Sequence, residues 1–414
     1  MRPRVCFALW AVWSMRADAC IHHLQSRNPS PPSMTRRSRP GARTKTAIRN
    51  VRVFNGISIE PPRTVIMDGE FIDIDPRGVE TTIDAQGRIL IPGLIDSHVH
   101  VNDVDGLETM TSFGVTTAMV MLRGHGGLCD VQLAGLPAVG PDTQHAKMFN
   151  MSSGQLLYPT ADPDAAVSYA FGNKSDFYKI TAEKNGPSQE MQTALVKSTH
   201  ERGKLAMTHA ANALSWKQAV LSGTDGIQHT ATDAPIDADV LTQAGAAGQF
   251  STPTMNMARY TFSNPILLGQ MGRTPNSPDS YAQVKANVKA IRAAGIPILA
   301  GTDAVGTLLP GVTIPFGLTL HYELQNLVEA TGMEPAEALA AATLVAARHH
   351  RLHDRGVIAP GMRADLVLLN SDPLANISNT LDIARVWVGG VEYAPVANGK
   401  EAAAASPNPS GTVG

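Results

Sequence analysis

The alternation of short β-like runs with helical segments constrains this chain more than any other feature. Between residues 94 and 303, apolar runs of four to eight residues recur, and segments with a helical pattern separate them. Repeated βα units that form a parallel sheet have this pattern. Eight such runs over about 210 residues fit a (β/α)8 barrel, which typically takes about 250 residues. We therefore predict an α/β fold of the TIM-barrel type. The predicted strands are 94–98, 115–121, 147–152, 177–181, 204–209, 226–229, 248–254 and 296–303.

Further β-like pieces flank this region on both sides. Turn signals such as Asn-Gly and Asp-Gly separate the N-terminal pieces, and a helical stretch at 320–350 precedes the C-terminal ones. We predict that both sets form one small β-sandwich over residues 46–92 and 356–395, beside a barrel over residues 93–355. Residues 396–414, rich in Ala, Pro and Ser, are predicted to be disordered. The β-like pieces are 48–54, 64–67, 71–74, 89–91, 356–358, 364–369 and 383–388.

The first 45 residues are read as a leader or a disordered basic segment. Residues 1–59 hold eleven basic residues and one acidic residue, although the whole chain has a formal charge of −2. A secretory signal with cleavage near Ala19, an organellar transit peptide, and a translation start at Met34 are three interpretations that the sequence leaves open, and the compartment with them. Downstream, no basic surface indicates nucleic acid, and no apolar run reaches the roughly 20 residues of a membrane span.

A His-x-His pair ends the first predicted strand. Side chains alternate between the faces of a strand, so Asp96, His98 and His100 share one side. Two imidazoles two residues apart can hold one cation. A single His-x-His is weak evidence, however, because two partly exposed strand-end histidines are the more common explanation.

Polar residues at other predicted strand ends make a metal site the better explanation of the His-x-His pair. Lys179 lies near the end of strand 4, His209 and His229 close strands 5 and 6, and Asp303 closes strand 8. Alone, each has an ordinary explanation, such as a lysine reaching solvent or an aspartate capping a helix. Together they stand at the carboxyl ends of the strands, where a barrel builds its active site.

This order of His-x-His, Lys, His, His and Asp resembles the amidohydrolase superfamily, and within it the imidazolonepropionase-like and Xaa-Pro-dipeptidase-like branch. The resemblance extends from about residue 47 to residue 392. It includes the approach Ile-Asp-Ala-Gln-Gly-Arg at 83–88 and the closing Gly-Val-Ile-Ala-Pro-Gly-Met-Arg-Ala-Asp-Leu at 356–366.

The resemblance implies a site for two divalent metal ions. Imidazole and carboxylate-type ligands suit zinc, with manganese or iron as alternatives. Lys179, carboxylated by CO2, would bridge the ions, because a carbamate presents two anionic oxygens whereas an ammonium cannot bind a cation. The other ligands would be His98, His100 and Asp303 for one ion, and His209 and His229 for the second.

The implied chemistry is hydrolysis of an amide or peptide-like C–N bond. A hydroxide between the two ions would attack the carbonyl carbon, and Asp303 would pass the proton to the leaving nitrogen. Asp96 would orient a ligand histidine. Lactone hydrolysis or decarboxylation on the same scaffold and a non-catalytic relative are the alternatives.

Substrate contacts are less well defined by the sequence. An N-acyl amino acid, a dipeptide or a ring amide would be a suitable small-molecule substrate. His125, Arg259, Tyr260 and His321 are candidates for lining the pocket, with Arg259 as the partner of a substrate carboxylate. The resemblance also implies a homo-oligomer, although no interface can be identified in the sequence.

Overall fold

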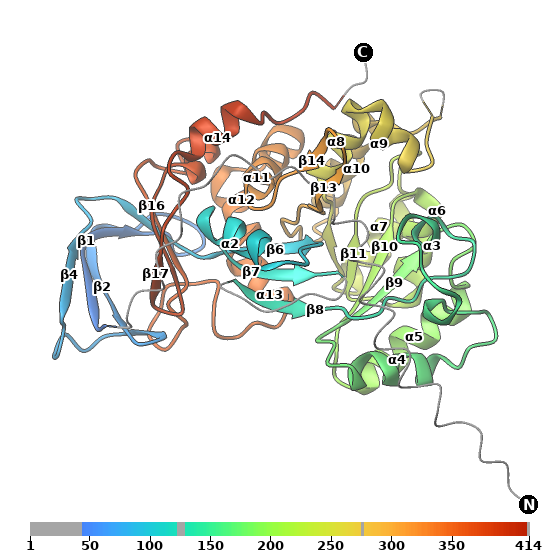
Figure 1. The fold of residues 1–414 in the computed structure, drawn as a ribbon, viewed down its shortest axis with the longest axis horizontal. Helices are drawn as coiled ribbons and strands as arrows, with labels where there is room; N and C mark the ends of the chain where they lie inside the picture. Colours follow the sequence, from blue (N-terminus) through green and yellow to red (C-terminus); the bar gives the residue numbers. More distant parts are fainter. Residues whose placement is uncertain (1–43, 122–128, 275–276, 412–414) are drawn as a thin grey trace, which may run out of the picture.

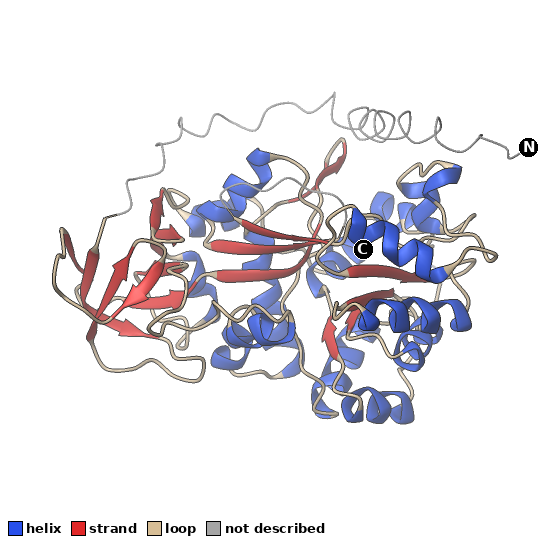
Figure 2. Ribbon diagram, turned by 90° about the horizontal axis from the view of Figure 1, so that it is seen from below, coloured by secondary structure: helices blue, strands red, loops and turns tan. Residues whose placement is uncertain are grey.

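The computed structural model describes residues 44–121, 129–274 and 277–411. Residues 1–43 of the predicted leader and the candidate His125 lie outside the described residues. A β-sheet occupies one end of the molecule, and parallel strands surrounded by helices form the rest (Figures 1 and 2). In the described residues, no helix is both long enough and apolar enough to cross a membrane.

The end sheet joins the two ends of the chain. β5 runs antiparallel to β15, and the strand order is β17-β16-β15-β5-β1-β2-β3, with β4 beside β1. Buried apolar side chains such as Ile48, Leu90 and Trp387 form its core. No strand forms at 356–358, and the residues shortly after it, Gly361 and Met362, exchange backbone hydrogen bonds with Ile72. The strands are β1 Thr46–Val53, β2 Arg63–Asp68, β3 Phe71–Asp73, β4 Thr81–Asp84, β5 Ile89–Pro92, β15 Leu366–Leu369, β16 Ile383–Val388 and β17 Val391–Tyr393.

The predicted α/β class is confirmed by two parallel sheets. One has the order β6-β7-β8 and the other β12-β11-β10-β9, and every pairing in them is parallel. These strands are buried on both faces, apart from β8. Their bounds are β6 Leu94–Val99, β7 Val115–Val120, β8 Asp130–Leu133, β9 Tyr178–Ala182, β10 Ala206–Ala210, β11 Gly226–Gln228 and β12 Phe250–Thr252.

The third predicted strand, at 147–152, is wrong. Helix α3, Gln144–Met148, occupies much of that segment, and the third parallel strand is β8. Methionine and phenylalanine at 148, 149 and 151 imitate a strand pattern, but the Thr143 side chain accepts a hydrogen bond from the amide of Ala146 and starts a helix. The half-buried residues Asp-Val-Gln-Leu of β8 carry little of the apolar signal that predicts a strand.

The eighth predicted strand, at 296–303, forms no regular strand. It still lies between β12 and β6, through parallel bridges of Ile298 to Ser251 and of Val99 to Ala304. A further bridge links Ala138 to Ile180 of β9. The parallel strands therefore form two sheets that isolated bridges join to each other.

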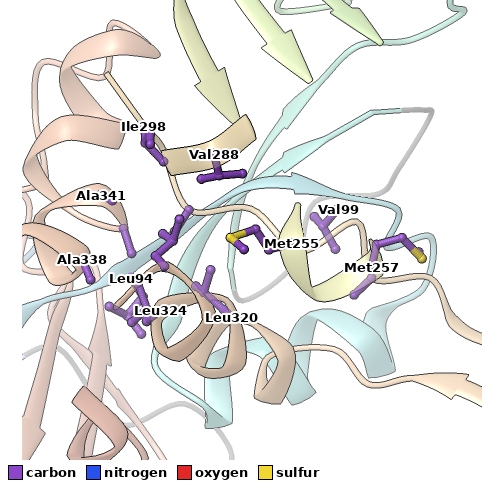
Figure 3. Packing of buried hydrophobic residues seen from close by; sticks show 14 of the residues in the cluster. Leu94, Val99, Met255, Met257, Val288, Ile298, Leu320, Leu324, Ala338 and Ala341 are labelled. Atoms are coloured by element: carbon purple, nitrogen blue, oxygen red, sulfur yellow. The ribbon is translucent and has the colours of Figure 1, made fainter. Parts of the chain in front are cut away.

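Helices pack around these strands. One cluster of buried apolar side chains lies between β6, α8 and α11, as Figure 3 shows for Leu94, Met255 and Leu320. The predicted helical stretch at 320–350 is divided into α11, α12 and α13. The helices are α2 Val104–Ser112, α3 Gln144–Met148, α4 Pro163–Gly172, α5 Gln189–Glu201, α6 Ala213–Ser222, α7 Ala238–Ala246, α8 Met255–Ser263, α9 Pro265–Gln270, α10 Tyr281–Ala293, α11 Leu318–Thr331, α12 Pro335–Ala341, α13 Leu344–His349 and α14 Gly399–Ala405.

The C-terminal segment differs from the predicted disorder. Helix α14 packs Ala402 and Ala403 against a buried cluster that includes Phe113, Leu318 and Tyr322. The Tyr322 hydroxyl donates to the carbonyl of Ala403 at 3.0 Å. Alanine is a strong helix former, and this apolar contact gives the short helix a surface on which to fold.

Candidate metal centre

The ligand candidates come together at one end of the parallel strands. His98 and His209 lie near the carboxyl ends of β6 and β10, and His229 follows β11 directly. Lys179 differs from the prediction, because it is the second residue of β9 and pairs with Met207. It therefore starts deeper than the histidines, and only its long side chain can reach their level.

His98, His100 and Asp303 form the tightest group. The Asp303 Oδ1 atom lies 3.1 Å from His100 Nε2 and 3.5 Å from His98 Nε2. One ligand atom from each of the three residues lies within 4.8 Å of the others, so this group could hold a metal ion. This supports the coarse prediction of a metal-binding site.

Two more histidines extend the group. The His229 ring centroid lies 4.6 Å from that of His98 and 4.5 Å from that of His209, and His229 Nδ1 is 3.7 Å from Asp303 Oδ2. Burial lowers the pKa of His98, His209 and His229 well below the usual histidine value. Neutral imidazole is the form that binds metal ions, so the chemistry of the cluster fits a cation.

Lys179 is buried without a visible partner. Its Nζ atom has no hydrogen bond to any residue that the structure describes. Burial lowers the pKa of Lys179 to about 7, while Asp303 opposes that shift. Buried polar groups are nearly always bonded, so an orphaned amine beside this cluster fits a group that the chain alone does not supply.

Neighbouring side chains orient two of the imidazoles. The Gln228 Oε1 atom lies 2.7 Å from His98 Nδ1, and because an amide oxygen only accepts, that Nδ1 carries the proton. The Nε2 lone pair is then directed toward Asp303. His229 Nδ1 makes a similar 2.7 Å contact with Thr254 Oγ1. The arrangement at His98 matches that of metal-binding histidines, which bond their second nitrogen in this way, whereas the His229 nitrogen at Thr254 is also the one 3.7 Å from Asp303 Oδ2.

Asp96 acts on the backbone rather than on an imidazole. Its Oδ1 accepts from the amides of His98 and Thr302, each at 3.1 Å, and its Oδ2 accepts from the Thr302 hydroxyl at 2.7 Å. Burial raises the pKa of Asp96 to about 7. The predicted orienting role therefore takes another form, in which Asp96 joins β6 to the residue before Asp303.

Three residues at the site have left-handed backbones. The φ angles are 70° at His229, 48° at Thr254 and 55° at Asp303. Such angles are unfavourable for residues with a Cβ and persist where surrounding contacts hold them, often at functional sites. Hydrogen bonds from the amide of His229 to the carbonyl of Thr252 and from the amide of Asp303 to that of His98 provide part of this support.

His145 is a further member of the cluster that the sequence did not reveal. Its ring centroid lies 4.3 Å from that of His209, and its Nδ1 is 2.9 Å from Glu183 Oε1. Phe149, at the end of the same helix, stacks near His100 with centroids 6.1 Å apart. Helix α3 therefore forms one wall of the site. The false strand at 147–152 hid this helix and its histidine.

The predicted substrate residues have other partners. The Arg259 guanidinium binds Asn326 Oδ1 at 2.7 Å, Glu329 Oε2 at 3.0 Å and the carbonyl of Pro409. Tyr260 follows it on α8. His321 is buried between Thr380 and the Phe113 carbonyl. None of these contacts connects the three residues with the histidine cluster.

Known proteins resemble this chain along most of its length. Imidazolonepropionase of Deinococcus radiodurans is 22% identical over 399 residues, which cover 86% of this chain and 96% of that enzyme. Adenine deaminase of Desulfatibacillum aliphaticivorans is 24% identical over 335 residues, which cover 77% of this chain and 53% of that enzyme.

Solved structures share the fold. A Xaa-Pro dipeptidase with bound methionine has a TM-score of 0.71 at 21% identity, covering 84% of this chain and 100% of that one. Molinate hydrolase has a TM-score of 0.70 at 20% identity, covering 84% and 94%.

The sequence profile of the amidohydrolase family matches residues 173–393, which is more than half of the chain. The relatives support the predicted imidazolonepropionase- and prolidase-like branch. The protein therefore belongs to the amidohydrolase family, as a hydrolase that acts on carbon–nitrogen bonds.

Proposed function

We propose that this chain is a metal-dependent amidohydrolase that cleaves the C–N bond of a small amide or dipeptide-like substrate. The observation that carries the proposal is the group of His98, His100 and His229 at Asp303, with His209 beside His229. We further propose that the parallel strands are the wall of a (β/α)8 barrel over residues 93–355, and that residues 46–92 and 356–395 form its companion β domain.

Two divalent ions, zinc in our proposal, would be held there. His98, His100 and Asp303 would bind one ion and His209 and His229 the other, with N6-carboxylated Lys179 between them. The orphaned Lys179 amine supports this assignment, since carboxylation would turn it into an anionic ligand. When bound, such ions polarise a carbonyl oxygen and lower the pKa of a water molecule.

Asp303 is the proposed proton carrier. Its carboxylate lies within 3.7 Å of three imidazoles and remains partly exposed, at 13% of its side-chain surface. It can therefore accept the proton of the attacking water and donate it to the leaving nitrogen. The imidazole of His145, from α3, lies beside that of His209, with ring centroids 4.3 Å apart.

A Lys179→Ala variant tests the bridging role. We expect zinc-reconstituted wild-type protein to carry two ions per chain and to hydrolyse members of a panel of N-acyl amino acids and dipeptides. The variant should lose at least one ion and roughly 100-fold or more in turnover, since ligand shells affect activity on this scale. Lys204→Ala is the matched control, because Lys204 lies over the Phe171 ring, 5.9 Å from its centroid.

Each part of the proposal has its own contradicting result. If Lys179→Ala keeps both ions and full turnover, the bridging assignment fails. Turnover of lactones without any turnover of amides would replace the C–N reaction with lactone hydrolysis, and release of CO2 would indicate decarboxylation. Wild-type protein that binds no divalent ion would indicate the non-catalytic relative.

A further inference from the structure

Helix α8 begins next to the candidate metal centre, with an unusual first residue. Its N-cap is Thr254, which has a left-handed backbone and makes no side-chain capping bond. A threonine at this position normally accepts a hydrogen bond from an amide in the first helical turn. Here the Thr254 hydroxyl lies 2.7 Å from His229 Nδ1 instead.

Another helix supplies the missing cap. Glu323 of α11 is fully buried, and its two carboxylate oxygens accept from the first amides of α8. Oε1 is 3.0 Å from the amide of Met255, and Oε2 is 2.7 Å from that of Asn256. These amides have no partner within their own helix, and a carboxylate is favoured at this end of a helix dipole.

We propose that Glu323 is a positioning residue for the metal centre, which caps α8 so that the Thr254 hydroxyl stays bonded to His229. The inference rests on the proposed function of the histidine cluster. Without Glu323, the first amides of α8 lose their acceptors, and the Thr254 hydroxyl stands at the position from which a threonine normally caps a helix. Its rotation toward them would break the contact with His229 and free that imidazole to turn.

The contacts on both sides of Thr254 agree with this role. Thr254 holds an unfavourable φ of 48°, and the residues that follow it are those bound by Glu323. His229 is also held through its backbone, where its carbonyl accepts from Trp216 Nε1 at 3.3 Å. Burying a carboxylate costs free energy unless the carboxylate is well bonded. If folding alone mattered, a helix cap by the Thr254 side chain would avoid the free-energy cost of burying Glu323.

Zinc affinity, measured by competition with a chromophoric chelator, tests the inference. We expect Glu323→Leu and Thr254→Val each to weaken zinc binding roughly 10- to 100-fold, as for other residues that orient metal ligands. Glu323→Gln should weaken it less, because its amide oxygen still accepts one bond, and Thr254→Ser should retain it. The double variant Glu323→Leu/Thr254→Val should bind no more weakly than the weaker single variant, because both act through one contact.

The control variant is His321→Asn on the same helix. His321 is buried and bonded to Thr380 and Phe113, on another side of α11, so its loss should lower the melting temperature without changing zinc affinity. Circular dichroism would establish that each variant is folded. Where Glu323→Leu does not fold, Glu323→Gln and the Thr254 variants decide the question.

Two results would overturn the inference while the proposed function stands. One is a folded Glu323 variant with the zinc affinity of the wild type. The other is a double variant whose loss of zinc affinity is the product of the losses in the two single variants. Wild-type protein that binds no divalent ion would overturn the proposed function, and this inference with it.

Discussion

His98 uses its two ring nitrogens for different purposes. Nδ1 donates a hydrogen bond to the Gln228 side chain, and Nε2 lies 3.5 Å from Asp303 Oδ1. Gln228 is itself fully buried and pairs with His209 in the β10–β11 register, so the sheet fixes the backbone from which its side chain reaches His98. A single buried amide therefore decides which nitrogen of a candidate ligand is free.

A Gln228→Leu variant should separate this orienting role from simple packing. The buried His98 N–H loses its acceptor, so the free energy of unfolding should fall by about 1–3 kcal/mol. Zinc affinity should fall roughly 10- to 100-fold. Chemical denaturation and chelator competition measure the two effects.

Gln192→Leu is the matched control for that experiment. Gln192 is an equally buried glutamine on α5 that donates to the carbonyl of Pro187 at 2.9 Å. Its replacement should cost about 1 kcal/mol of stability and leave zinc affinity unchanged. Equal loss of zinc affinity in both variants would show that Gln228 contributes only to packing.

At the scale of elements, the segment 296–303 must approach β6 very closely. The amide of Ser97 donates to the carbonyl of Ala300, and the amide of Thr302 donates to that of His98. A Cβ added at Gly301 would lie 2.8 Å from the His98 amide nitrogen and 2.5 Å from Thr252 Cγ2. Only glycine allows this approach, which brings Asp303 to His98 of β6 and to His100, which follows the strand.

Gly301→Ala should push the segment away from β6. We expect a loss of about 1–3 kcal/mol in the free energy of unfolding, as for other overpacked interiors. Zinc affinity should also fall, because Asp303 moves from His98 and His100. Thermal unfolding with and without zinc measures both changes.

Gly269→Ala serves as its control. An added Cβ at Gly269 meets no atom within 4 Å, and this glycine lies within α9. Alanine there should raise stability by about 0.5–1 kcal/mol. A Gly301→Ala protein with unchanged zinc binding would mean that the close approach serves only the core.

At the scale of the whole molecule, the C-terminal segment connects parts that are distant in sequence. The amide of Val396 donates to the carbonyl of Ser112 at the end of α2, and α14 packs on α11. Farther along, Pro409 accepts from Arg259, and the Gly411 amide donates to Ser263 at the end of α8. The segment therefore extends across α2, α11 and α8.

Deleting residues 394–414 should loosen this arrangement. Uncovering Phe113, Leu318 and Tyr322 should cost about 2–4 kcal/mol, which urea denaturation would detect. Zinc binding should persist, because the lost contacts are with Arg259, Ser263 and the cluster around Phe113, rather than with the ligand residues, Thr254 or Glu323. A shorter deletion of residues 412–414 leaves the described contacts in place and should match the full chain in stability.

Much of the fold was predictable because its signals are local. The end-sheet strands and most of the parallel strands appear within a few residues of their predicted places, since apolar runs and turn residues mark them directly. The errors arose where local and tertiary signals disagree. β8 is polar for a strand of a parallel sheet, and helix α14 depends on an apolar contact with α11 that no window of the sequence contains.

In the candidate site, too, some residues could be predicted from local sequence signals and others could not. His98, His100, His209, His229, Asp303 and Lys179 could be found by their recurrence at predicted strands. His145 was hidden because its segment imitates a strand, and nothing in the sequence connects it with Glu183, 38 residues away.

By itself, the sequence determined the chemical types of the ligand candidates and their strands, because alternation along a strand is a local property. The tertiary structure alone decided how those ligands are oriented. Gln228 and His98 are 130 positions apart, and Glu323 lies 68 positions from Met255. Contacts at such separations leave no periodic trace, since they exist only after the strands and helices have packed.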